Sequence, residues 1–183
     1  MTGIIIIVVL VALILLYFVS TYNTLVGLRN KVKDSWAQID VVLKNRNDLI
    51  PNIVETVKGY AKHESGTLKE VIEARSKMAS ATTREDEMKA SGEVTQALGK
   101  LFALAESYPE LKANTNFLDL QNKLNEVEEK IRFSRQFYND TVLTYKNKLE
   151  MFPSNIVAGM FGFKSEAFFE ATEEERKNVQ VKF

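Results

Sequence analysis

The sequence predicts an all-α protein in which an N-terminal transmembrane helix continues into an antiparallel, up-and-down bundle of three to four long helices. Three observations support this fold class. The first is an uncharged apolar run from Gly3 to Val19. The second is a pair of long seams of apolar residues with the three- and four-residue spacing of a helix face. The third is the scarcity of helix breakers, since the 183 residues include only three prolines and eight glycines.

The run GIIIIVVLVALILLYFV, from Gly3 to Val19, is long enough to serve as a membrane anchor. A helix rises about 1.5 Å per residue, so this run and its flanks approach the ~30 Å of a bilayer's hydrocarbon core. Tyr17 and Tyr22 fall where amphipathic rings favour the membrane interface. The alternative is a cleaved secretory signal, but that needs a positive n-region and small residues near the cleavage site. We therefore expect an uncleaved anchor over residues 1–22.

Basic residues predict the orientation of this anchor. Arg29, Lys31 and Lys33 follow the span closely, whereas no charged side chain precedes it. The positive-inside rule then places the N-terminus outside and the helical domain in the cytoplasm. The expected protein is a single-pass protein of the cell membrane that contacts the lipid bilayer through residues 3–19.

Residues 23–152 are expected to form the helical bundle, and the first of their helices continues the anchor. Its seam keeps the same phase on both sides of Pro51, which favours a kink at the proline. A break is the alternative, with Asn47 or Asp48 capping a restarted helix. The seam consists of Leu25, Leu28, Val32, Trp36, Ile39, Leu43, Arg46, Ile50, Ile53, Val57 and Tyr60.

Two shorter helical segments are expected in the middle of the chain. Thr67 and Glu70 have the spacing of a capping box, which predicts the start of the first. An acidic turn at 85–87 predicts the start of the second, which ends before Pro109. The weak interruption between the two segments also allows one bent helix.

The last long helix is expected to be capped by Asn114 or Asn116 and to end at Phe152-Pro153. Its seam consists of Phe117, Leu120, Leu124, Val127, Ile131, Ser134, Tyr138, Val142, Tyr145, Leu149 and Phe152. Its outer face carries three pairs of opposite charge with i,i+4 spacing, which favours ion pairs along the helix. These pairs are Asp119–Lys123, Glu126–Lys130 and Glu128–Arg132.

Residues 153–183 differ in character from the bundle. Large apolar side chains crowd between Phe152 and Phe169, together with Gly159 and Gly162, in a stretch too short to span a bilayer. We expect a Phe-rich strap that packs across the end of the bundle. The alternative is an exposed apolar patch that binds a partner or the membrane surface.

Composition and motifs argue against several function classes. Lys plus Arg and Asp plus Glu both number 24, and no basic block is present, so nucleic acid is not an expected partner. The chain has no cysteine and one histidine, His63, which leaves no thiolate site and no metal-binding motif. Neither a phosphate-binding glycine loop nor a nucleophile elbow is present. We expect a protein that is not an enzyme, with no cofactor, no metal and no catalytic residue.

The candidate interaction residues are polar side chains in the apolar seams. Arg46 would be partly buried, so it needs a carboxylate partner. The candidates for that partner are Glu55, Glu128 and Glu129. A second cluster is expected on the last helix, from Arg135, Tyr138 and Asn139 with Asp140. The Arg46 pair is interpreted either as a structural ion pair that fixes helix register or as a latch that a partner opens.

Several segments together resemble the bacterial LemA family. The most specific is YNTLVGLRNKVKDSWAQIDVVLKNRNDLIPNIVETVKGYAKHE, from Tyr22 to Glu64. The resemblance continues through YPELKANTNFLDLQNKL, Arg135 with Tyr138-Asn139, FPSNIVAGMFGF and the C-terminal Val-x-Phe of residues 181–183. The chain departs from the usual pattern at three places. Asn45 stands where a basic residue is common, Glu129-Lys130 stand where Asn-Arg is common, and the proline that usually precedes Val-x-Phe is missing.

The resemblance implies one N-terminal membrane helix, an α-helical bundle and no catalytic residue, because the family has no established activity. Its members tend to occur beside membrane metalloproteases, and one branch is linked to assembling internal membrane compartments. We therefore expect a non-enzymatic scaffold or adaptor that binds other membrane or membrane-proximal proteins, takes part in envelope maintenance, and forms homo-oligomers through exposed helix faces. The alternatives are an envelope-facing ligand-binding sensor or enzyme with an unrecognised pocket, and a membrane-remodelling element that uses the Phe-rich tail.

Overall fold

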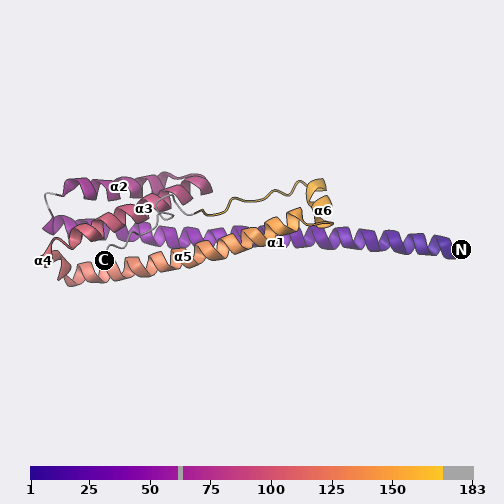
Figure 1. Cartoon of the computed structure of the whole chain (residues 1–183), viewed down its shortest axis with the longest axis horizontal. Coiled ribbons are helices and arrows are strands. Elements are labelled where there is room, and N and C mark those ends of the chain that lie inside the picture. Colours follow the sequence, from indigo (N-terminus) through magenta and orange to yellow (C-terminus); the bar gives the residue numbers. More distant parts are fainter. Residues whose placement is uncertain (62–63, 171–183) are drawn as a thin grey trace, which may run out of the picture. The chain divides into compact units, whose positions relative to one another are not determined.

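The computed structural model describes residues 1–61 and 64–170, and every regular element among them is a helix (Figure 1). The all-α fold class is therefore confirmed. The helices are α1 (Thr2–Tyr60), α2 (Ser65–Ser80), α3 (Arg84–Ala105), α4 (Pro109–Lys112), α5 (Thr115–Glu150) and α6 (Ser154–Met160). His63 and the C-terminal residues 171–183, which include the Val-x-Phe of residues 181–183, lie outside the described residues.

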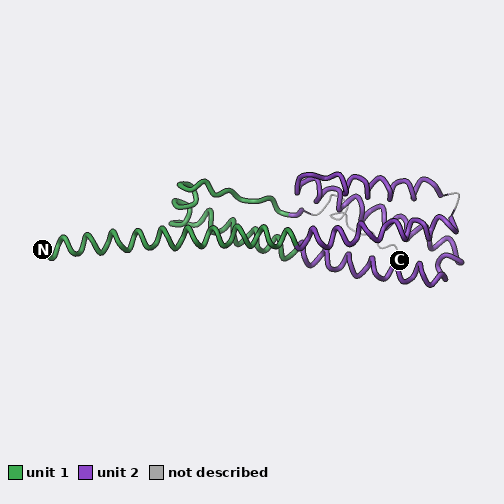
Figure 2. Tube along the Cα trace, turned by 180° about the vertical axis from the view of Figure 1, so that it is seen from behind, with its two compact units in different colours: residues 1–37, 136–168 green, residues 38–135, 169–183 purple. Residues whose placement is uncertain are grey.

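Two compact units make up the chain, and both long helices contribute to each (Figure 2). Unit 1 contains residues 1–37 and 136–168, and unit 2 contains residues 38–135 and 169–183. Each unit has its own apolar core. Buried side chains of unit 1 include Leu25, Val32, Trp36, Tyr138, Val142 and Val157. Those of unit 2 include Leu43, Ile50, Ile53, Leu98, Leu101, Phe117, Leu124 and Ile131.

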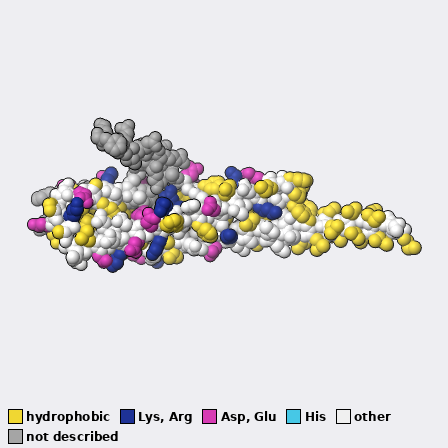
Figure 3. All heavy atoms as spheres, turned by 60° about the horizontal axis from the view of Figure 1, so that its bottom comes forward, with side chains coloured by type: hydrophobic (Ala, Val, Ile, Leu, Met, Phe, Trp, Pro, Cys, Tyr) yellow, Lys and Arg dark blue, Asp and Glu magenta, His cyan; other side chains and the backbone are white. Residues whose placement is uncertain are grey.

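The apolar run at the start of α1 is not buried in the protein. An 18-residue window there has a mean hydropathy of 3.2, and none of it is buried. Hydrophobic side chains cover this stretch of α1 on the face drawn in Figure 3. By length and composition it could cross a membrane, and α1 is the one helix with that property in the described part of the chain.

Helix α1 continues through Pro51, so the alternative of a break and a restarted helix is wrong. A proline has no N–H to donate, which leaves the carbonyl of Asn47 without its usual helical partner. Arg75 of α2 supplies a substitute, because its Nε lies 3.2 Å from that carbonyl oxygen. The side chain of another helix thus completes the hydrogen bonding of α1 at the proline.

We expect Arg75→Ala to lower the free energy of unfolding by about 1–3 kcal/mol, because it leaves a part-buried carbonyl without a donor. In a Pro51→Ala background the restored N–H of residue 51 serves the same carbonyl, so Arg75→Ala should cost much less there. A double-mutant cycle by chemical unfolding measures this difference. If Arg75→Ala lowers the free energy of unfolding equally in both backgrounds, Arg75 does not replace the missing N–H of residue 51 as the donor to the Asn47 carbonyl.

Capping side chains set two of the helix starts. Thr83 caps α3, since its Oγ1 accepts from the backbone N–H of Asp86 at 3.1 Å. Helices α2 and α3 are therefore separate, and they lie side by side (Figure 1). Asn114 rather than Asn116 caps α5, because its Oδ1 accepts from the N–H of Phe117 at 3.0 Å. The predicted capping box at Thr67 is wrong. Helix α2 begins two residues earlier, at Ser65, with no side-chain hydrogen bond at its N-cap.

After α6 the chain reverses and runs back within unit 1. Gly162 has a φ of +67°, which favours glycine, and the N–H of Phe163 bonds to the carbonyl of Ala158 at 3.0 Å. The following segment packs on α5, where the Tyr138 hydroxyl donates to the carbonyl of Ala167 at 2.9 Å. Trp36 packs on the same tyrosine, with ring centroids 5.2 Å apart.

Tyr145 is a second buried tyrosine of unit 1, and its hydroxyl has no hydrogen-bond partner among the described residues. Burial raises the pKa of this phenol above its ordinary value of about 10, although the nearby Arg29 opposes the shift. The folded state therefore favours the neutral phenol. Its contribution to stability is present below pH ~10 and is lost as the pH rises through the raised pKa.

We expect Tyr145→Phe to keep or raise the free energy of unfolding, by up to about 1 kcal/mol, because it removes a buried hydroxyl without a partner. It should also reduce the loss of stability above pH ~10. Tyr138→Phe is the matched control and should cost about 0.5–1.5 kcal/mol, because it removes a made hydrogen bond. Urea unfolding of both variants at neutral and alkaline pH measures the contrast. The interpretation fails if the two substitutions cost the same.

Candidate functional site

The most unusual group in unit 2 is the guanidinium of Arg46, which α1 places inside the apolar core. Arg46 is only 1% exposed. Its position follows from the seam of α1, where it stands one helical turn from Leu43 and Ile50, which are both fully buried. A buried charge of this kind persists only when other groups satisfy it.

Three side chains from two other helices satisfy this guanidinium. Its Nη1 lies 2.8 Å from Glu128 Oε1 on α5 and 2.9 Å from Thr95 Oγ1 on α3. Its Nη2 donates to Ser91, to the hydroxyl at 2.9 Å and to the backbone carbonyl at 3.2 Å. Thr95 in turn donates to the carbonyl of Ser91 and lies 3.3 Å from the second carboxylate oxygen of Glu128. We call Arg46, Ser91, Thr95 and Glu128 the Arg46 network.

The network joins α1, α3 and α5 by hydrogen bonds. A buried ion pair adds little net stability over an apolar replacement, since desolvation offsets most of the attraction. Removing one partner is costly, because the other charge stays buried and unpaired. The geometry fits both interpretations of the Arg46 pair, a structural ion pair that fixes helix register and a latch that a partner opens.

The structure brings Arg46 and Glu128 together but not the other carboxylates that the sequence offered. Glu55 is exposed and lies 3.3 Å from Lys58. Glu129 is also exposed and pairs with Arg132 at 2.5 Å. The predicted Glu128–Arg132 pair is therefore wrong, because Glu128 faces the core. Asp119 and Lys123 do pair along α5, at 2.7 Å.

The other candidate interaction residues hold the C-terminal segment. Within unit 2, the guanidinium carbon of Arg135 lies 4.3 Å from the ring centroid of Phe169, and its Nη2 lies 3.3 Å from the carbonyl of Glu170. Within unit 1, the Tyr138 hydroxyl donates a hydrogen bond to the carbonyl of Ala167, and Asn139 is half-buried on the same helix. These contacts are packing contacts of the chain with itself.

No role was assigned from the sequence to Ser91, Thr95 or Arg75. One signal was available, since Ser91 and Thr95 stand four residues apart on a helix and so share a face. A polar pair on that face is a suitable acceptor for a buried arginine. Pro51 indicated that the Asn47 carbonyl would lack its helical donor, but nothing in the sequence indicated that Arg75 would donate to it.

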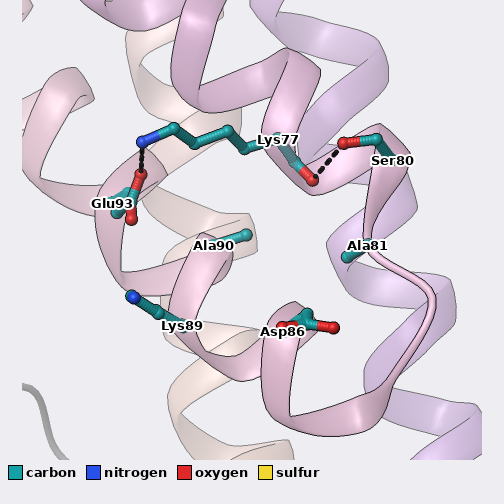
Figure 4. Close-up of a pocket in the computed structure, with 7 residues that line it drawn as sticks. All are labelled: Lys77, Ser80, Ala81, Asp86, Lys89, Ala90 and Glu93. Atoms are coloured by element: carbon teal, nitrogen blue, oxygen red, sulfur yellow. Dashed lines mark hydrogen bonds and ion pairs between the residues drawn. The ribbon is translucent and has the colours of Figure 1, made fainter.

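The network leaves little capacity for ligand chemistry, because its oxygens already accept hydrogen bonds from Arg46 and from each other. Among the described residues, no group of three or more His, Asp or Glu side chains could hold a metal. A hollow of about 300 Å³ lies between α2 and α3, and Figure 4 shows its lining residues. Lys77 and Glu93 close one side of it with an ion pair at 2.6 Å, which raises the pKa of Lys77. Lys77 is exposed and Glu93 is partly exposed, and a pair of this kind is a common surface feature.

The all-helical fold and the exposed apolar stretch of α1 indicate a membrane-associated helical protein. The family model of the LemA family matches residues 35–183. The chain belongs to the LemA family.

Relatives of this chain have low sequence identity but long alignments. Protein LemA of Metamycoplasma hominis is 24% identical over 165 residues, which cover 90% of this chain and 75% of the relative. Magnetosome protein MamQ 2 of Paramagnetospirillum magneticum is 25% identical over 175 residues, which cover 81% of this chain and 64% of the relative. Magnetosome protein MamQ of Magnetospirillum gryphiswaldense is 24% identical, with the same two shares. The chain thus spans less than two thirds of the length of the magnetosome proteins.

Proposed function

We propose that this protein is a non-enzymatic, single-pass scaffold or adaptor that binds other proteins at the bacterial membrane. The observation that carries this proposal is the continuity of α1, which is one helix from the exposed apolar stretch to Tyr60. A continuous helix would join the membrane-spanning stretch to the bundle without a flexible linker.

Exposed aromatic and aliphatic side chains on the bundle suit a protein-binding role. Phe133 on α5 is 60% exposed, and the guanidinium of Arg132 lies 4.8 Å from its ring centroid. Aromatic residues and arginine are enriched among the residues that dominate protein–protein binding energy. Val41 on α1 and Ile72 on α2 are also exposed by half or more. The proposal makes Phe133 the first position at which to search for a partner.

The proposal also includes a cytoplasmic location for the bundle, which rests on the basic residues that follow the span. Because the chain has no cysteine, a single cysteine at Ser65 gives a unique label site. An impermeant thiol reagent should leave it unlabelled in intact cells and label it after lysis. Labelling of intact cells would instead favour an envelope-facing protein.

Photocrosslinking in membranes tests the scaffold role. A photoreactive phenylalanine analogue replaces Phe133 in the full-length protein, and the same analogue at Asn122, an exposed polar position of α5, is the control. We expect crosslinked products of higher mass from position 133 and few from position 122. Recovery of monomer alone from both positions would count against a scaffold or adaptor.

A further inference from the structure

A row of large apolar side chains is exposed where α5 turns into α6, within unit 1. We call residues 151–161 the apolar elbow. Its exposed side chains are Met151 (59%), Phe152 (79%), Ile156 (47%), Met160 (66%) and Phe161 (56%). Single exposed apolar residues are ordinary, but a contiguous group marks an interaction surface.

Helical spacing shows that the elbow has two distinct faces. Ile156 and Met160 stand four residues apart on α6, so they share one face of this short helix. Val157 and Ala158 are buried on its other face. The inner face of α6 is therefore satisfied by the core of unit 1, and the outer face has no covering element among the described residues.

The elbow adjoins the end of the apolar stretch of α1. The ring of Phe161 lies 4.7 Å from that of Tyr22, and the ring of Phe163 lies 5.6 Å from it. Tyr22 follows Val19 by three residues, which is ~5 Å along a helix. Figure 3 shows hydrophobic side chains gathered over α6 and the adjoining part of α1. The exposed surface of the elbow is thus continuous with the surface that would face lipid.

The order of residue types beyond the span matches the layers of a bilayer. The uninterrupted apolar run of α1 ends at Val19, the rings of Phe161 and Phe163 contact Tyr22, and Arg29 follows Tyr22 by about 10 Å along α1. The guanidinium carbon of Arg29 lies 5.3 Å from the ring centroid of Phe163. Aromatic rings favour the membrane interface, and cations favour the anionic headgroups beyond it.

We propose that the apolar elbow inserts into the interfacial layer of the same bilayer that α1 crosses. The occupant of this surface is lipid, because the elbow is continuous with a lipid-facing helix and lies at the level where that helix leaves the hydrocarbon. The protein would then contact the membrane at two places, the spanning stretch of α1 and the apolar elbow. The elbow would restrict the tilt and rotation of the anchor, which a lone helix leaves to its neighbours.

Single-cysteine labelling of the full-length protein tests this proposal, since the natural chain has no cysteine. An environment-sensitive fluorophore is placed at Ile156 or Met160, and at the exposed Asn147 of unit 1 as the matched control. The protein is inserted at one copy per nanodisc of phosphatidylcholine with some phosphatidylglycerol. Aqueous iodide and nitroxide groups on the lipid chains then serve as quenchers.

We expect strong nitroxide quenching and several-fold weaker iodide quenching at 156 and 160, and the reverse at 147. Iodide quenching at 156 and 160 that equals the control would overturn the proposal. Protection of positions 156 and 160 from both quenchers would also overturn the proposal, because it would show that protein rather than lipid covers the elbow. The nanodisc with one copy excludes a second copy as that cover, and circular dichroism checks that each variant keeps its helices.

Discussion

Glu128→Ala is expected to lower the free energy of unfolding by about 3 kcal/mol, the lower end of the range for breaking a buried ion pair. The reason is that Arg46, at 1% exposure, would keep its charge in the core after losing its only described carboxylate partner. The lower end applies because Glu128 itself is 29% exposed. Chemical unfolding of the detergent-solubilised protein, followed by far-UV circular dichroism, measures the change.

Glu129→Ala is the matched control, since it is the next residue on the same helix and also forms an ion pair. That pair with Arg132 is exposed on both sides, so its loss should cost less than about 1 kcal/mol. A pair of variants with equal stabilities would show that Glu128 does not compensate a buried charge.

Arg46→Met separates the two interpretations of the network. An apolar side chain of similar length fills the same space, and the Glu128 carboxylate that loses its partner is 29% exposed, so the variant should still fold and should lose less stability than Glu128→Ala does. If it also keeps its crosslinked partners at Phe133, the ion pair serves helix register. A folded variant that loses those partners would identify the network as a latch.

A flexible Gly-Ser insert between Tyr22 and Leu25 is expected to abolish most partner crosslinking at Phe133. The insert interrupts α1 just before Leu25, a fully buried residue, and separates the anchor from the bundle. The helices of unit 2 should persist, because their core lies beyond the insertion. Crosslink yield from membranes measures the effect, and circular dichroism measures the helix content.

The control for this variant is the same insert in the loop 81–83 between α2 and α3, which leaves α1 intact. Removal of the residues after Glu175 gives a second comparison. Both should reduce crosslinking less than the insert in α1. Equal losses in the three variants, or no loss in any, would remove the continuity of α1 as the basis of the proposed function.

The long helices could be predicted because their information is local and repeated. The seams of α1 and α5 recur every three or four residues, and most of their members are buried as that spacing requires. The caps were less predictable. Asn114 and Asn116 both had the right chemistry, and only the backbone geometry decides which one caps α5. The Thr67 and Glu70 pair had the right spacing but lies within α2.

The candidate site was only partly predictable, because its contacts join distant parts of the chain. The position of Arg46 in the seam indicated that it needed an acceptor. The choice of Glu128, which is 82 residues away, depends on how α5 is rotated against α1. Local spacing instead favoured Glu128–Arg132, and that pairing is available only to a glutamate that faces solvent. The exposure of the apolar elbow is likewise a tertiary property, since the same residues could have covered a core.

The Arg46 network also has an evolutionary consequence. Any single replacement of Arg46 or Glu128 by a shorter residue leaves a charge or a cavity that the other members cannot repair, so the effects of changes at these positions are not additive. The positions of Arg46, Ser91, Thr95 and Glu128 should therefore be inherited as a set. Lineages that lose the arginine to a long apolar residue should then be free to lose the other three.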